Sequence, residues 1–85
     1  MTNGFDPTIT VKLFASSREI IGRDKLQVEL FEKMTVRDLR EMILATQPLL
    51  SKIQFVIAVN HKVVNDATTL NQTDEVAVLP AVSGG

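Results

Sequence analysis

Apolar and polar residues alternate in three separate stretches of the chain, and this period of two is typical of strands buried on one face. The stretches are residues 9–15, 25–30 and 75–79. Phe14 in the first stretch and Leu79 in the last fall on the outer face, although both are large and apolar. Phe14 is therefore expected either to be covered by another part of the chain or to belong to an exposed apolar surface. The residues predicted to face inward are Ile9, Val11, Leu13, Ala15, Leu26, Val28, Leu30, Val76 and Val78.

Two segments carry helix signals. Residues 16–22 begin with serines that can cap a helix and end at Gly22, which suits a left-handed terminus. Thr35 and Asp38 form a variant capping box, and the helix that they open is predicted to run to about Gln47. Its apolar stripe indicates a core-facing helix rather than a cofactor site. The residues of that stripe are Val36, Leu39, Met42, Ile43 and Thr46.

A continuous apolar run at residues 55–59 is too short for a globular helix, so it predicts a strand that is covered on both faces or central in its sheet. Before it, Leu49 and Leu50 are expected to close the end of the core. After it, residues 60–62 predict a turn into a two-residue strand, followed by a loop that Leu70 pins to the core. Two strands, one main helix and further strands indicate an α+β fold with one sheet curled over one helix.

The composition excludes several classes of function. The 85 residues make one domain without cysteine, which excludes disulfides, iron–sulfur ligation and a cysteine nucleophile in this chain. A net charge of −1 without Trp or Tyr argues against a nucleic-acid partner, and no apolar run approaches the ~20 residues that cross a membrane. There is no acid–base pair, phosphate-binding glycine loop or metal-ligand cluster, and His61 is expected to be solvated rather than catalytic. We therefore expect a cytoplasmic protein that itself binds no metal or cofactor.

The printed sequence ends in Gly84 and Gly85, and a glycine pair has no Cβ to obstruct a narrow channel. Such a segment can deliver its carboxylate to a buried reaction centre. Pro80 cannot donate a ladder hydrogen bond, so it is expected to end the last strand and release an extended tail. The alternative is a frayed terminus without function. The chain is expected to divide into a flexible leader at residues 1–7, a domain at 8–80 and a functional tail at 81–85.

Several short motifs follow one another in a specific order along the chain. They are residues 11–15, Arg18 and Glu19 with Gly22, Thr35 and Val36 with Leu39, Val59 and Asn60, residues 74–77, and residues 79–80 leading to 82–85. With these motifs the sequence resembles the small subunits of molybdopterin synthase, which are MoaD-type sulfur carriers of the ubiquitin-like β-grasp family. The likeness covers nearly all of the chain after the leader. It departs from the family at Thr73, where a glycine is common, and at Ala81, where a second proline is frequent.

The resemblance implies a mixed sheet of about four to five strands over one main helix, with a flexible Gly-Gly tail. It also implies a carrier cycle, because a terminal carboxyl with a pKa of about 3.5 is an anion at neutral pH and resists nucleophiles. A separate activating enzyme uses Mg-ATP to adenylate Gly85, and a persulfide donor then converts the adenylate to a thiocarboxylate. In a heterotetramer of two small and two large subunits, the large subunit transfers this sulfur to a cyclic pyranopterin precursor and forms the dithiolene of molybdopterin. This chain would be the non-catalytic carrier subunit.

The expected site residues follow from the same resemblance. Neighbouring first and last strands would place Phe14 beside Leu79 in an apolar docking patch for the large subunit, with Val63 as a third member. Arg18 either pairs with a carboxylate of the partner or remains solvated. The remaining site residues lie along the tail and are Pro80, Val82, Ser83, Gly84, which permits passage, and Gly85, which carries the sulfur.

Three other functions stay open. Another β-grasp sulfur carrier, serving thiamine synthesis or tRNA thiolation, would share the Gly-Gly end and much of the chemistry. A ubiquitin-like modifier would join its terminal glycine to lysine through an isopeptide bond. A plain ubiquitin-like interaction domain would make no use of the tail, so truncating the tail would change nothing.

Overall fold

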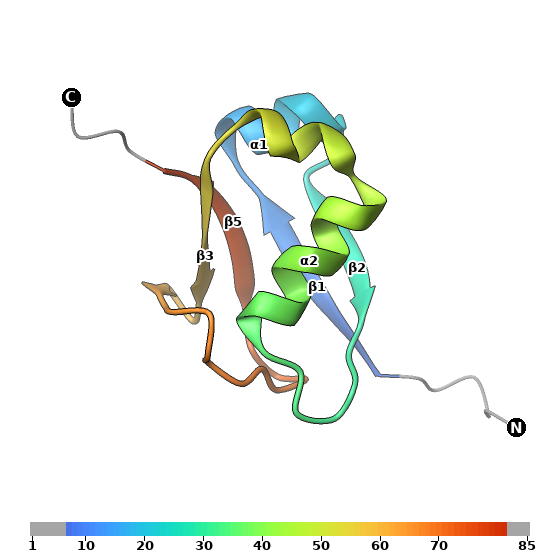
Figure 1. The fold of residues 1–85 in the computed structure, drawn as a ribbon, viewed down its shortest axis with the longest axis vertical. Coiled ribbons are helices and arrows are strands. Elements are labelled where there is room, and N and C mark those ends of the chain that lie inside the picture. Colours follow the sequence, from blue (N-terminus) through green and yellow to red (C-terminus); the bar gives the residue numbers. More distant parts are fainter. Residues whose placement is uncertain (1–6, 82–85) are drawn as a thin grey trace, which may run out of the picture.

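A mixed sheet with one long helix across one face dominates the computed structural model, which describes residues 7–81 (Figure 1). A second, shorter helix lies at one end of the sheet. The predicted α+β class is confirmed, and the sheet has five strands. In chain order the elements are β1 (Thr8–Leu13), α1 (Ala15–Ile21), β2 (Lys25–Glu29), α2 (Val36–Thr46), the 3-10 helix η1 (Pro48–Lys52), β3 (Phe55–Val59), β4 (Lys62–Val63) and β5 (Val76–Pro80).

The strands lie in the order β2-β1-β5-β3-β4. The first and last strands are therefore neighbours, as expected, and they run parallel, with Lys12 opposite Ala77 and Leu13 opposite Val78. All other neighbouring strands pair antiparallel. β5 is therefore the central strand of the five, with β1 on one side and β3 on the other.

The core fills the space between α2 and the inner face of the sheet. Leu50 is fully buried as predicted, but Leu49 is 52% exposed, because the η1 turn directs only one of the two leucines inward. Thr46 is exposed as well, and its Oγ1 donates to the carbonyl oxygen of Met42 at 3.0 Å instead of packing in the core. The fully buried aliphatic and methionine side chains are Ile9, Val11, Leu13, Met34, Val36, Leu39, Ile43, Leu50, Ile57, Val76 and Val78.

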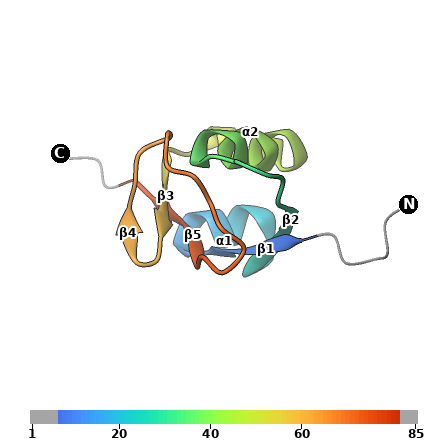
Figure 2. The ribbon, with the colours of Figure 1, turned by 90° about the horizontal axis from the view of Figure 1, so that it is seen from below.

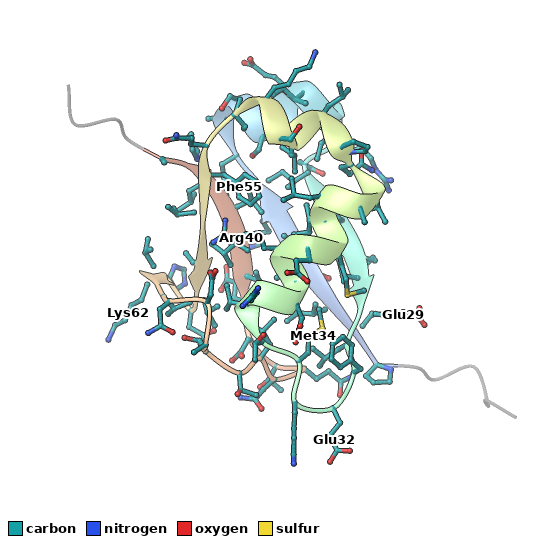
Figure 3. All side chains as sticks on the ribbon, viewed as in Figure 1. Glu29, Glu32, Met34, Arg40, Phe55 and Lys62 are labelled. Atoms are coloured by element: carbon teal, nitrogen blue, oxygen red, sulfur yellow. The ribbon has the colours of Figure 1, made fainter. Side chains whose placement is uncertain are left out.

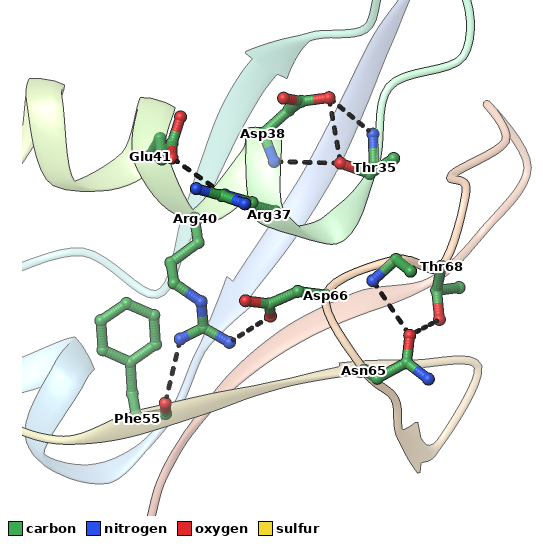
Figure 4. Close-up of polar contacts among 10 residues, drawn as sticks. Thr35, Arg37, Asp38, Arg40, Glu41, Phe55, Asn65, Asp66 and Thr68 are labelled. Atoms are coloured by element: carbon green, nitrogen blue, oxygen red, sulfur yellow. Dashed lines mark hydrogen bonds and ion pairs between the residues drawn. The ribbon is translucent and has the colours of Figure 1, made fainter.

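The predicted capping box at the start of α2 is confirmed (Figure 4). The Asp38 backbone N–H donates to Thr35 Oγ1 at 3.3 Å, and the Thr35 backbone N–H donates to Asp38 Oδ2 at 3.0 Å. The next two orphan donors of the helix are those of Val36 and Arg37, and they donate to carbonyl oxygens of the loop before β5, at 2.9 and 3.0 Å. The loop is therefore held by the helix start as well as by the buried Leu70 side chain.

Arg40 fastens α2 to β3 from the polar side of the helix (Figures 3 and 4). Its guanidinium lies 5.2 Å from the centre of the Phe55 ring and donates to the Phe55 carbonyl oxygen at 3.2 Å. The same group pairs with Asp66 Oδ1 at 3.2 Å. One side chain therefore joins the helix, the strand and the loop.

The prediction that Ala15 faces inward at the end of the first strand is wrong. β1 ends at Leu13, and Ala15 starts α1 with a φ of 54°, which turns its side chain into solvent. Ser17 occupies the buried position instead and is 0% exposed. Gly22 ends α1 in the left-handed conformation that was predicted, with a φ of 79°.

Pro80 ends the last strand, as predicted, but the chain does not leave the sheet at that residue. Pro80 belongs to β5 and lies opposite Phe55, and the N–H of Ala81 still donates to the Gln54 carbonyl oxygen at 3.0 Å. Antiparallel partners alternate between bonded and non-bonded pairs, and the bonded pair at residues 54 and 81 makes Pro80 a non-bonded position. A missing N–H at Pro80 therefore costs no ladder bond to β3.

We predict that Thr35→Ala lowers the free energy of unfolding by about 1 kcal/mol, because it removes the acceptor of a helix N–H. For a domain of this size the melting temperature should fall by about 4–8 °C in thermal denaturation followed by circular dichroism. Arg37→Ala is the matched control, because it removes only an exposed ion pair with Glu41, worth under about 0.5 kcal/mol. Equal losses in the two variants would contradict a stabilising cap.

Candidate docking face at the root of the tail

The sheet face opposite α2 carries no helix among the described residues (Figure 2). Strand register places Lys12, Ala77, Ala58 and Val63 in one row across four strands of this face. The two residues in the middle of the row are alanines, whose short side chains leave a depression in the surface. The larger side chains around them therefore enclose a hollow.

That hollow has a volume of about 300 Å³ and brings together the three residues predicted to dock a partner, Phe14, Val63 and Leu79. We call these three residues the docking patch. Phe14 is 43% exposed and Val63 is 62% exposed, so both remain accessible, whereas Leu79 is half-buried. Exposed apolar side chains that gather around one hollow are typical of a protein-binding surface.

Ser17 holds Phe14 in place, a role that the sequence pattern did not reveal. The Phe14 backbone N–H donates to Ser17 Oγ at 3.1 Å, and Ser17 Oγ donates in turn to the Phe14 carbonyl oxygen at 2.6 Å. Phe14 thus sits in an extended conformation between β1 and α1, with a φ of −128°. A serine three residues after Phe14 is the only signal for this arrangement, and it also fits an ordinary helix cap.

A charged rim borders the hollow on the side away from Phe14 and Leu79. Glu75 accepts from Lys12 Nζ at 3.1 Å, and His61 Nε2 lies 3.4 Å from its other carboxylate oxygen. The hydrogen bond and positive charge of Lys12, and then the charge of His61, lower the pKa of the Glu75 carboxyl. His61 is exposed, as expected, and it lies in a turn where it and Asn60 both have positive φ.

The other predicted site residues lie apart from this hollow or outside the described chain. Arg18 is exposed on α1 and does not line the hollow. Pro80 follows Leu79 at the end of β5, so the docking patch adjoins the point where the tail begins. Val82, Ser83, Gly84 and Gly85 lie outside the residues that the structure describes.

Two kinds of site are not found in residues 7–81. No three or more His, Cys, Asp and Glu side chains come together in a group that could hold a metal ion. None of the helices in this part of the chain has the length and apolar character needed to cross a membrane. The docking patch is thus the feature of the described chain that most directly indicates a function.

Comparison with known proteins identifies relatives along almost the whole chain. Residues 11–85 match the model of the ThiS family. A molybdopterin synthase sulfur carrier subunit from Chlamydomonas reinhardtii is 37% identical over 81 residues, which cover 91% of this chain and 98% of the relative. A protein of the same name from Caenorhabditis briggsae is 33% identical over 82 residues, which cover 92% of this chain and 98% of the relative.

Solved structures share the fold. A Pyrococcus furiosus chain, described as a candidate subunit 1 of molybdopterin converting factor, has a TM-score of 0.80 at 32% identity and covers 88% of this chain and 98% of its own. SAMP1 from Haloferax volcanii has a TM-score of 0.79 at 25% identity, covering 92% and 99%. A chain in a complex of subunits 1 and 2 of molybdopterin-converting factor from Helicobacter pylori has a TM-score of 0.65 at 25% identity, covering 92% and 99%.

The likeness to the two sulfur carrier subunits spans at least 91% of this chain, so it is not confined to the tail or to one motif. The predicted family resemblance and the predicted fold are confirmed. The chain belongs to the ThiS family, in which the molybdopterin synthase sulfur carrier subunits are its relatives.

Proposed function

We propose that this chain is the sulfur carrier subunit of a molybdopterin synthase and carries sulfur as a thiocarboxylate on Gly85. One observation above all supports the proposal: an accessible apolar docking patch adjoins the strand that leads into the Gly-Gly end. A carrier needs both features together. The patch binds the partner. The glycine pair, which has no side chains, then enters the partner's active site.

The chemistry must come from partner enzymes, because a carboxylate does not react with a sulfur nucleophile until it is activated. An activating enzyme with Mg-ATP converts Gly85 to an acyl-adenylate and releases pyrophosphate. A persulfide donor then displaces AMP, and reductive cleavage of the new S–S bond by a thiol leaves the thiocarboxylate. The absence of cysteine from the chain agrees with a role in which sulfur arrives from outside.

The large subunit of the synthase is the proposed partner of the docking patch. The Helicobacter pylori relative supports this, since it is a complex of subunits 1 and 2 of molybdopterin-converting factor. We propose an assembly of two small and two large subunits in the cytoplasm. There the tail donates its sulfur to a cyclic pyranopterin precursor, and two carriers supply the two sulfurs of the dithiolene.

Protein modification is a second candidate, supported by one observation. SAMP1 from Haloferax volcanii, a small archaeal modifier protein, matches this fold with a TM-score of 0.79 at 25% identity. A modifier would use the same adenylate but pass Gly85 to a lysine amine rather than to sulfur. The two functions therefore differ in the atom that finally attacks Gly85.

We predict that deleting Gly85, or replacing Gly84 by Val, abolishes sulfur transfer while the melting temperature stays unchanged. The first change removes the position of the activated carboxyl, and the second adds a branched side chain to a segment that must pass a narrow channel. Transfer would be measured as molybdopterin formed with the large subunit, the activating enzyme, Mg-ATP and a persulfide donor. Gln72→Ala, in an exposed loop, is the control. Full activity without Gly85 would contradict the proposal.

We also predict that Phe14→Asp weakens binding to the large subunit by roughly 30-fold, because a charge replaces an apolar anchor of the interface. The measurement is titration calorimetry with the purified large subunit. Phe31→Asp is the matched control, since Phe31 is 51% exposed but lines a different hollow, beside Leu30 and Leu70. If both variants bind with the same affinity, the partner docks elsewhere.

A further inference from the structure

β2 forms one edge of the sheet, and among residues 7–81 it has a strand neighbour on one side only. The Leu13 N–H donates to the Asp24 carbonyl oxygen at 2.9 Å, and the Leu30 N–H donates to the Pro7 carbonyl oxygen at 2.9 Å. Bonded pairs alternate along an antiparallel ladder, so the even-numbered residues from 24 to 30 direct their backbone groups toward β1. The N–H and C=O groups of Lys25, Gln27 and Glu29 therefore point away from the sheet.

The three residues with outward backbone groups also form a self-complementary charge pattern. Lys25 lies at one end of β2, Glu29 at the other, and the neutral Gln27 in the middle. If a second copy of β2 pairs antiparallel about a two-fold axis at Gln27, each Lys25 lies opposite Glu29 of the other copy. In this register the pairs at residues 25, 27 and 29 are all bonded pairs. A two-fold register centred at residue 28 pairs Glu29 with Gln27 and leaves Lys25 opposite Phe31. One centred at residue 26 pairs Lys25 with Gln27 and places Glu29 opposite Arg23, which lies in the bend before β2 rather than in the strand.

Within its own sheet this strand leaves both charges unpaired. Lys25 lies opposite Lys12 on β1, a like charge, and Lys12 itself pairs with Glu75. Glu29 lies opposite Thr8 at the end of the ladder, and Figure 3 shows it at the outer margin of the fold. Neither Lys25 nor Glu29 forms an ion pair with any residue between 7 and 81. An approaching edge with the same sequence would pair both.

A hollow with both polar and apolar lining residues lies beside the same edge on the helix side. It has a volume of about 380 Å³, and its apolar lining comes from Leu26 and Val28 of β2 and Met42 of α2. In the two-fold register, Leu26 lies opposite Val28 of the second copy. The two cross-strand apolar pairs would then cover part of each hollow, while Gln27 is held clear of the edge by its bond to Thr10 Oγ1 at 2.8 Å.

We propose that two copies of this chain associate edge to edge through β2, with the two sheets joined into one. The interface is isologous, because residue 25 of each copy meets residue 29 of the other. β2 lies on the opposite side of the sheet from β3 (Figure 1), and no residue of the docking patch belongs to β2: Phe14 directly follows β1, Leu79 is in β5 and Val63 is in β4. Both docking patches and the ends of both β5 strands stay clear of the interface. The pairing rests on neither sulfur transfer nor the large subunit.

Sedimentation equilibrium of the full chain at low ionic strength tests the proposal. We expect a monomer–dimer equilibrium that weakens as salt is added, because the two ion pairs are exposed. Lys25→Glu and Glu29→Lys, made singly, each place like charges in both cross-strand pairs. Each should raise the dimer dissociation constant at least about tenfold. An equimolar mixture of the two single variants restores two opposite-charge pairs, and so does the double variant K25E/E29K; both should associate as the unaltered chain does.

Two further variants separate this edge from other surfaces. Gln27→Pro removes the central outward N–H and should abolish the dimer with little change in melting temperature, since an edge position tolerates proline. Lys62→Glu, on the opposite edge strand, should change nothing. A chain that stays monomeric up to about 1 mM would overturn the proposal. A dimer whose dissociation constant is the same in the charge variants at residues 25 and 29 would also overturn it. So would a dimer that dissociates when Phe14 is replaced by Asp.

Discussion

The parallel pairing of β1 with β5 is the interaction on which the rest of the structure depends. It joins the first strand of the described chain to the last, so the sheet depends on residues more than 60 positions apart in the sequence. The same register that buries Leu13 beside Val78 carries Phe14 toward Leu79 on the opposite face. Core formation and the assembly of the docking patch are therefore two consequences of one strand pairing.

The two faces of the sheet have different roles. Aliphatic side chains on the inner face pack against α2, and the cap at Thr35 and the Arg40 contacts hold that helix and the loop before β5 in position. The outer face has alanines where the inner face has large residues, which leaves a hollow with apolar walls and a charged rim. The inner face stabilises the fold, and the outer face offers a surface that a partner can recognise.

Residue patterns predicted the local structure better than the contacts between distant segments. Alternation correctly assigned the inward residues of β1 and β5, and the Thr35–Asp38 spacing identified the cap, because both depend on residues close in sequence. A period of two shows which face of the sheet a residue lies on, but it does not show which strands are neighbours. The prediction that Phe14 lies beside Leu79 therefore rested on the family resemblance. Ala15 was misplaced because a single positive φ decided its position. Pro80 does end the last strand, but the hydrogen bond that Ala81 makes beyond it depends on which pairs of the β3–β5 ladder are bonded, and no local pattern shows that. The contacts of Glu75 with Lys12 and His61 join segments distant in sequence, and no local pattern indicates them.

The central claim concerns the chemical state of Gly85, and mass spectrometry of the native protein tests it most directly. The intact chain should be purified from its own cells without reducing or alkylating reagents, and the modified position located by fragmentation. We predict a population in which one carboxyl oxygen of Gly85 is replaced by sulfur, together with a co-purifying large subunit. Gly85 joined by isopeptide bonds to lysines of other proteins, with no thiocarboxylate present, would contradict a sulfur carrier and make the chain a protein modifier.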